Sequence, residues 1–186
     1  MKYLVTLLAL VTVLSTNAQT KINGIVMPNV VKTNGKYLKI NGGGVREKMF
    51  LDLYVGVLYL EEKSSDASTI INADKSMAIK MRIISGMVSK DNMEEAIREG
   101  FDKSTGGRVD AIKDKINSLI EKGFAGEIVK GDVFDLIYTP GKGTSLIKNN
   151  KELVTISGLD FKKALFGIWL CDKPADANLK KKMLGK

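Results

Sequence analysis

The segment from Asn41 to Leu60, NGGGVREKMFLDLYVGVLYL, constrains the fold more than any other part of this chain. Three consecutive glycines lead to Arg46, and a long strand-like run follows, with Tyr54 and Tyr59 inside it. Because a strand rather than a helix follows these glycines, they indicate a β-bulge or a close backbone approach, not a dinucleotide-binding loop. An arginine beside a buried strand costs free energy unless an anion pairs with it. That anion is either a side chain of the protein or a ligand.

Residues 1–18 have the pattern of a secretory signal peptide. Lys2 supplies a positive charge, residues 4–14 are apolar and uncharged, and small and polar residues lead to a cleavage position after Ala18. The apolar stretch is shorter than the roughly 20 residues that a membrane-spanning helix needs. We therefore expect a periplasmic or secreted protein with no membrane span and a single domain over residues 19–186.

The composition excludes several classes of function. The chain has no histidine, which removes the usual general base and a common metal ligand, and no close pair of carboxylates stands out. We predict no metal and no cofactor, and an ordinary hydrolase is disfavoured. The single cysteine, Cys171, excludes an internal disulfide. Its neighbours Trp169 and Leu170 indicate that it is a buried core residue.

The formal net charge of +8 raises the question of a charged partner. The basic residues are scattered, except for residues 180–182, which we interpret as the solvated end of a helix. Aromatic residues are few and are not interleaved with basic ones, so we expect no nucleic-acid binding. The sequence leaves the oligomeric state open.

Hydrophobic periodicity predicts an α+β fold. The expected strands are at 21–39 (broken at Asn34-Gly35), 50–60, 76–84, 133–139, 144–148 and 152–156. The expected helices are at 66–72, from Ser89 or Asp91 to 105, over 109–120, at 159–170 and at 176–183. This order predicts an antiparallel sheet covered on one side by helices. In the strand at 50–60 the odd positions are all apolar and the even ones mixed, which predicts some polarity on one face.

Arg46 and Tyr54 are the candidate functional residues. Arg46 is either part of a structural ion pair or exposed, or it presents a guanidinium fork to a carboxylate or enolate oxygen. Tyr54 is either a core tyrosine or a hydrogen-bond donor to the same anion. The two share parity, but eight residues of straight strand span about 26 Å. A joint site therefore requires a bend, for which Glu47-Lys48 is the expected place.

Several stretches resemble the bacterial branch of the chalcone isomerase-like family. They are GGGVREK at 42–48, LYVGVLYL at 53–60, YTPGKGT at 138–144, GLDFKKALFGIWL at 158–170 and PADxxLK at 174–180. The resemblance covers most of the chain beyond the signal peptide. It implies an open-faced β-sandwich, in which a large antiparallel sheet carries a layer of helices and the ligand lies in the cleft between them.

The resemblance also implies roles for the candidate residues. In the plant chalcone isomerases, an arginine at the position of Arg46 helps to hold a substrate phenolate during an intramolecular ring closure. In the fatty-acid-binding members, an arginine and a tyrosine bind the carboxylate. Arg46 and Tyr54 match that pair better, because the plant enzymes carry a threonine where this chain has Tyr54. Residues 85–93 lack the tyrosine that the plant enzymes use there, and Lys90 is the candidate for their lysine.

Three hypotheses follow. The first is an exported, non-catalytic binder of a fatty acid or similar apolar carboxylate, with Arg46 and Tyr54 as ligand-binding residues. The second is an intramolecular lyase or isomerase acting on a chalcone-like phenolic or enone, with Arg46 as the catalytic residue. The third is an envelope protein that binds another protein, with Arg46 in a structural salt bridge.

Overall fold

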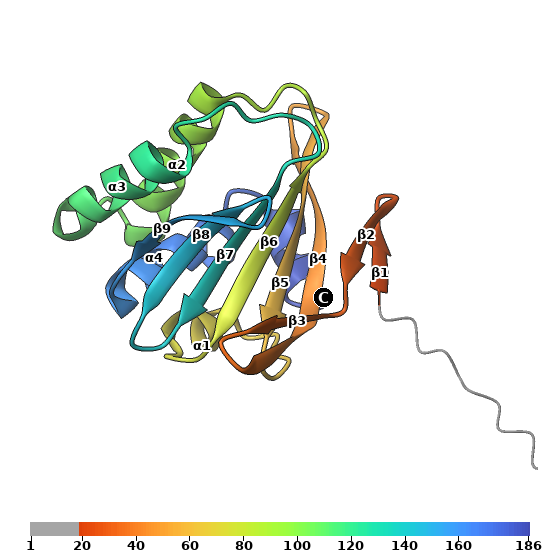
Figure 1. Cartoon of the computed structure of the whole chain (residues 1–186), viewed down its shortest axis with the longest axis horizontal. Helices are drawn as coiled ribbons and strands as arrows, with labels where there is room; N and C mark the ends of the chain where they lie inside the picture. Colours follow the sequence, from red (N-terminus) through yellow and green to blue (C-terminus); the bar gives the residue numbers. More distant parts are fainter. Residues whose placement is uncertain (1–18) are drawn as a thin grey trace, which may run out of the picture.

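The chain forms a seven-stranded antiparallel sheet in which strands consecutive in the sequence are neighbours (Figure 1). This computed structural model describes residues 19–186, so the predicted signal peptide lies outside the described residues. The strands are β3 (Val30–Thr33), β4 (Lys36–Lys48), β5 (Leu51–Leu60), β6 (Met77–Ile83), β7 (Val133–Thr139), β8 (Gly143–Lys148) and β9 (Lys151–Ile156). Their simple meander is that of an α+β protein, as the sequence predicts.

Helices cover one face of this sheet. They are α1 (Ala67–Asn72), α2 (Lys90–Thr105), the short η1 (Asp110–Ile112), α3 (Lys113–Gly123), α4 (Leu159–Leu170) and α5 (Ala177–Met183). Ser89 rather than Asp91 is the N-cap of α2, since its side chain accepts a hydrogen bond from the backbone of Asn92. Gly106 ends that helix in the left-handed conformation. The prediction of an antiparallel sheet with a helix layer is confirmed.

The main core lies between the sheet and the helices. Buried side chains from β5 to β8 meet those of all five α-helices there. In β6 the alternation is as predicted, because Met77, Ile79, Met81 and Ile83 face this core. The prediction that Cys171 is a buried core residue is wrong, because Cys171 is only half-buried. Cys171 is the first residue after α4 and has an extended backbone, so it is not part of the apolar side of that helix.

The outer face of the sheet carries a second, smaller core. Val55, Val57 and Tyr59 of β5 point to it, and apolar residues of β1 (Gln19–Ile22), β2 (Ile25–Pro28) and β3 pack against them. The β1–β2 hairpin lies beside the main sheet (Figure 1). Both faces of β5 are therefore buried from Tyr54 to Leu60, which the prediction of one partly polar face missed.

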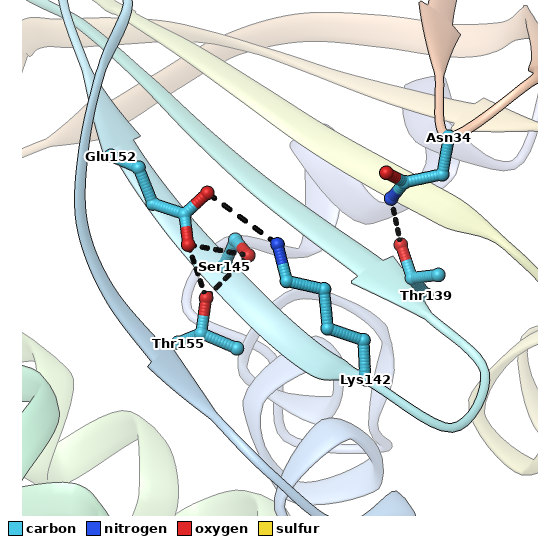
Figure 2. A network of polar contacts seen from close by, with 6 residues as sticks. All are labelled: Asn34, Thr139, Lys142, Ser145, Glu152 and Thr155. Carbon is cyan, nitrogen blue, oxygen red and sulfur yellow. Dashed lines mark hydrogen bonds and ion pairs between the residues drawn. The ribbon is translucent and has the colours of Figure 1, made fainter.

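The rest of the outer face is polar. Figure 2 shows Glu152 accepting hydrogen bonds from Ser145 and Thr155, with the ammonium group of Lys142 at 3.5 Å. Nearby, Asn34 in the β3–β4 turn donates to Thr139 at the end of β7, over 2.6 Å. This side of β7, β8 and β9 is a solvated sheet surface.

Candidate functional site

Arg46 and Tyr54 lie directly opposite each other on β4 and β5. The turn between these strands is at Met49 and Phe50, so the expectation of a bend at Glu47-Lys48 is wrong by two residues. Residues that lie opposite in an antiparallel pair share a face and are about 5 Å apart. The guanidinium carbon of Arg46 lies 5.7 Å from the centroid of the Tyr54 ring. The hairpin thus removes the 26 Å separation that a straight strand would impose.

The consecutive glycines let α5 lie directly on β4. A Cβ atom at Gly42 would overlap the carbonyl oxygen of Lys182, and one at Gly44 would clash with the side chain of that lysine. The strand also bulges here, because the register shifts between Ile40 and Gly42. Both interpretations of the glycines, a bulge and a close approach of backbone, are confirmed.

Two hydrogen bonds tie α5 to the strand around Arg46. Asn41, the extra residue of the bulge, donates from its side chain to the carbonyl oxygen of Met183 over 2.7 Å. At the other end, the backbone N–H of Glu47 donates to the carboxylate of Asp176, the N-cap of α5, over 3.0 Å. Arg46 is therefore held between two fixed points of the backbone.

Arg46 forms no salt bridge within the part of the chain that the structure describes, although, after the hydrogen bond and charge of Lys103, its charge helps to lower the pKa of Glu99. The guanidinium is half-buried, and its Nε–H is fully buried without a hydrogen-bond acceptor. No carboxylate of residues 19–186 forms a salt bridge with it. An unpaired buried donor of this kind costs free energy. This orphaned donor is a feature of a site that an acceptor from outside the protein would complete.

Tyr54 is buried and neutral. It is 3% exposed, and desolvation raises the pKa of its phenol, an effect that the positive charge of Arg46 partly opposes. Its hydroxyl oxygen accepts a hydrogen bond of 2.8 Å from the indole nitrogen of Trp169 on α4. The indole occupies a lone pair of the oxygen, so the hydroxyl proton remains able to donate to an acceptor. Sequence reasoning placed Trp169 within the expected helix at 159–170 and missed this role.

Two apolar cavities meet at Arg46 and Tyr54, between the sheet and the helices. The inner cavity has a volume of about 30 Å³, and Met81, Ile97, Leu165 and Trp169 are among its walls. It has space for about two water molecules. The outer cavity, of about 220 Å³, runs toward the β4–β5 turn and the loop after β6.

Met93 and Ala96 of α2 border both the inner and the outer cavity, as Arg46 and Tyr54 do. A methionine side chain is unbranched and adapts readily to the shape of its neighbours.

Lys90 does not belong to this site. It is the first residue of α2, is exposed, and borders none of the cavities around Arg46. A polar recess of about 150 Å³ on the other side of Arg46 is bordered instead by Lys48, Glu99 and Lys103. In the described residues, no group of three histidine, cysteine or acidic side chains is arranged to hold a metal ion.

The fold and the site define a class of small α+β proteins with a cavity between an antiparallel sheet and its helix layer. A family profile described as chalcone isomerase-like matches residues 19–185, and the chain belongs to this family. Among curated protein sequences, none matches the chain.

A solved structure shares this fold. It is the crystal structure of a fatty-acid binding protein from Arabidopsis thaliana, which superposes with a TM-score of 0.72. The two sequences are 16% identical, and the similarity covers 89% of this chain and 95% of the plant protein. Across residues 19–186, moreover, none of the helices combines the length and the apolar character needed to cross a bilayer.

Proposed function

We propose that this protein is a non-catalytic binder of a fatty acid or a similar apolar carboxylate. The observation that carries the proposal is the guanidinium of Arg46, which lacks a carboxylate partner among the described residues and borders an apolar cavity. The plant protein with the same fold, described as a fatty-acid binding protein, supports the same class of ligand.

The proposed binding mode divides the ligand into two parts. The carboxylate accepts charge-assisted hydrogen bonds from Arg46 and a further one from the hydroxyl of Tyr54. The acyl chain lies in the apolar cavities beside α2, and each methylene group that leaves water contributes about 0.8 kcal/mol. Neutralisation of the charge makes burial of the head group possible, and the chain supplies most of the affinity.

The alternative of an isomerase rests on the same two donors. Arg46 and Tyr54 lie close enough together to stabilise an oxyanion that develops on a phenolic or enone substrate. Incubation with a chalcone and measurement of its absorbance separates the two proposals. A rate above background that depends on Arg46 would favour the isomerase, and no such rate is expected for a binding protein. The third hypothesis required Arg46 in a salt bridge, which the described residues do not contain.

The export of the protein remains part of the proposal and rests on the sequence of residues 1–18. Expression in a bacterial host followed by fractionation tests it. The expected product is found outside the cytoplasm, and its intact mass corresponds to a chain that begins at Gln19. Retention of the full-length chain in the cytoplasm would contradict this part.

Two measurements test the ligand. Extraction of lipid from the freshly purified protein, followed by mass spectrometry, is expected to yield a fatty acid. In titrations with a fluorescent fatty acid, Arg46→Ala is expected to weaken binding about 10- to 100-fold, since a hydrogen bond to a charged group contributes about 1.5–3 kcal/mol. Arg98→Ala is the matched control, because Arg98 is exposed and pairs with Glu94 one turn away. Equal affinity of the two variants would contradict the proposal.

A further inference from the structure

The tip of the β4–β5 hairpin exposes large apolar side chains. Met49 is 82% exposed and Phe50 is 104% exposed, relative to an isolated residue. Leu51 and Met87, at 44% and 63%, lie at the same rim of the outer cavity. In residues 19–186, four of the eight exposed large hydrophobic side chains thus gather here. Figure 1 shows this hairpin tip at the same end of the molecule as the loop between β6 and α2.

The backbone at the tip is strained. Met49 and Phe50 have φ angles of +51° and +65°, a region that bulky residues avoid. The other hairpin turns of this chain with paired positive φ angles use asparagine and glycine, at Asn23-Gly24, Asn34-Gly35 and Asn149-Asn150. Those residues are the ones that such turns favour. Two apolar residues are therefore held outward at a position where the same chain elsewhere uses small polar residues or glycine.

This apolar tip continues into the cavity of the candidate site. Met49, Leu51 and Met87 border the outer cavity, at whose inner end Arg46 and Tyr54 lie. An apolar ligand that enters here follows the apolar part of the cavity wall, although Lys48, Asn92 and Glu95 also line this cavity. The exposed side chains of Met49, Leu51 and Met87 thus border the same cavity as Arg46 and Tyr54.

The small size of the rim indicates what covers it. A stable protein–protein interface involves about 20–30 residues on each side, which is far more than the four apolar side chains here. A lipid surface needs only a short apolar projection to enter its interface. Anionic lipids attract a protein with a formal net charge of +7, which is the +8 of the full sequence without Lys2 of the predicted signal peptide. Lys48 also borders the outer cavity, and Glu95 of α2 offsets its charge there.

We propose that Met49 and Phe50, with Met87, insert into the interface of a lipid bilayer and that the acyl ligand passes between bilayer and cavity at this point. The inference deepens the proposed function and rests on it, because only an apolar ligand requires such a path. The partner is the lipid surface itself.

Phe50→Gly is the sharpest test, because Phe50 does not border the cavity and glycine suits its positive φ angle. With vesicles of phosphatidylcholine and phosphatidylglycerol, we expect this variant to bind at least 10-fold more weakly in co-sedimentation. Transfer of a fluorescent fatty acid from the vesicles should slow by a similar factor, while affinity for the free fatty acid and the thermal midpoint do not fall. Tyr37→Ser, which removes an aromatic side chain that is 61% exposed away from the rim, is the matched control.

The outcomes separate this inference from the proposed function. Arg46→Ala should weaken fatty-acid binding by the factor given above and keep vesicle binding. If the wild-type protein binds fatty acid but Phe50→Gly binds vesicles as well as the wild type does, the role of the tip is refuted. The proposed fatty-acid binding is then unaffected. If Phe50→Gly instead abolishes self-association and leaves vesicle binding unchanged, a second copy of the chain covers the tip and the inference is overturned. If the wild-type protein binds no fatty acid, the proposed function fails, whatever the vesicles show.

Discussion

The indole nitrogen of Trp169 donates a hydrogen bond of 2.8 Å to the hydroxyl oxygen of Tyr54, across 115 residues of sequence. Both side chains are almost fully buried, Trp169 on α4 and Tyr54 on β5. The bond fixes the orientation of the phenol in the helix-covered core and ties the sheet to the helix layer. Tyr54, the proposed hydrogen-bond donor to the ligand carboxylate, is thus positioned by Trp169. No local pattern in the sequence indicates this role of Trp169.

This bond predicts an energetic coupling between the two residues. Tyr54→Phe leaves the indole N–H buried without an acceptor and should lower the free energy of unfolding by about 1–3 kcal/mol. In a Trp169→Phe background the same substitution should cost less, because the unpaired donor is absent. A double-mutant cycle by urea denaturation measures the coupling, with the exposed Tyr37→Phe as control. Additive effects of the two substitutions would show that the bond contributes nothing.

The contact between β4 and α5 predicts that Gly42 tolerates no side chain. Gly42→Ala places a Cβ atom against the carbonyl oxygen of Lys182, so α5 must shift away from the strand. We expect a loss of stability of at least about 1–3 kcal/mol, the usual effect of overpacking. Gly126→Ala is the control, since no atom lies within 4 Å of the position its Cβ would take. A thermal midpoint for Gly42→Ala that equals that of the control would contradict this packing.

Ala96 offers a way to obstruct the cavity without removing a polar group. It borders the inner cavity, the outer cavity and the polar recess next to Arg46. Ala96→Phe should fill the space between the cavities and weaken fatty-acid binding by at least 10-fold. The same change at Ala111, an exposed residue of η1, should leave binding unchanged. Unaltered binding by Ala96→Phe, measured by fluorescence titration, would place the acyl chain elsewhere.

Lys162 predicts a distinctive dependence of stability on pH. Its side chain is fully buried on α4, and its ammonium group donates to the carbonyl oxygens of Ile70, Ile71 and Ala73 at the end of α1. Burial lowers its pKa to about 8, whereas a lysine in the unfolded chain has a pKa of about 10.4. Between these values the unfolded state binds more protons, so the contribution of Lys162 to stability rises with pH.

A comparison of the wild-type protein with Lys162→Met isolates that contribution. From pH 8 to pH 9.5, the free energy of unfolding of the wild type should rise relative to the variant by about 1–2 kcal/mol. Well below pH 8 both states bind the proton, and the difference should be constant. Urea denaturation at several pH values measures it. A relative loss of stability over this interval would mean that the carbonyl oxygens outweigh desolvation and hold the pKa high.

Much of the fold could be predicted because the relevant pattern is local. The alternation in β6 and the helical spacing in α2, α3 and α4 are patterns within short, continuous segments of the sequence. The turn at Met49 and Phe50 could not be read in this way, because neither residue favours a positive φ angle. The strand character of residues 42–48 was missed for a related reason, since their glycines make room for α5 and contribute no apolar alternation.

The sequence by itself determined the class of fold, and it singled out Arg46 as a basic residue in need of an anion. Only the tertiary structure decided that Tyr54 lies opposite Arg46, because that depends on the register of the hairpin. It also decided that Trp169 completes the site and that no described carboxylate pairs with Arg46. Periodicity reports which face of an element is apolar, whereas the partners of a polar group are set by contacts between residues distant in the chain.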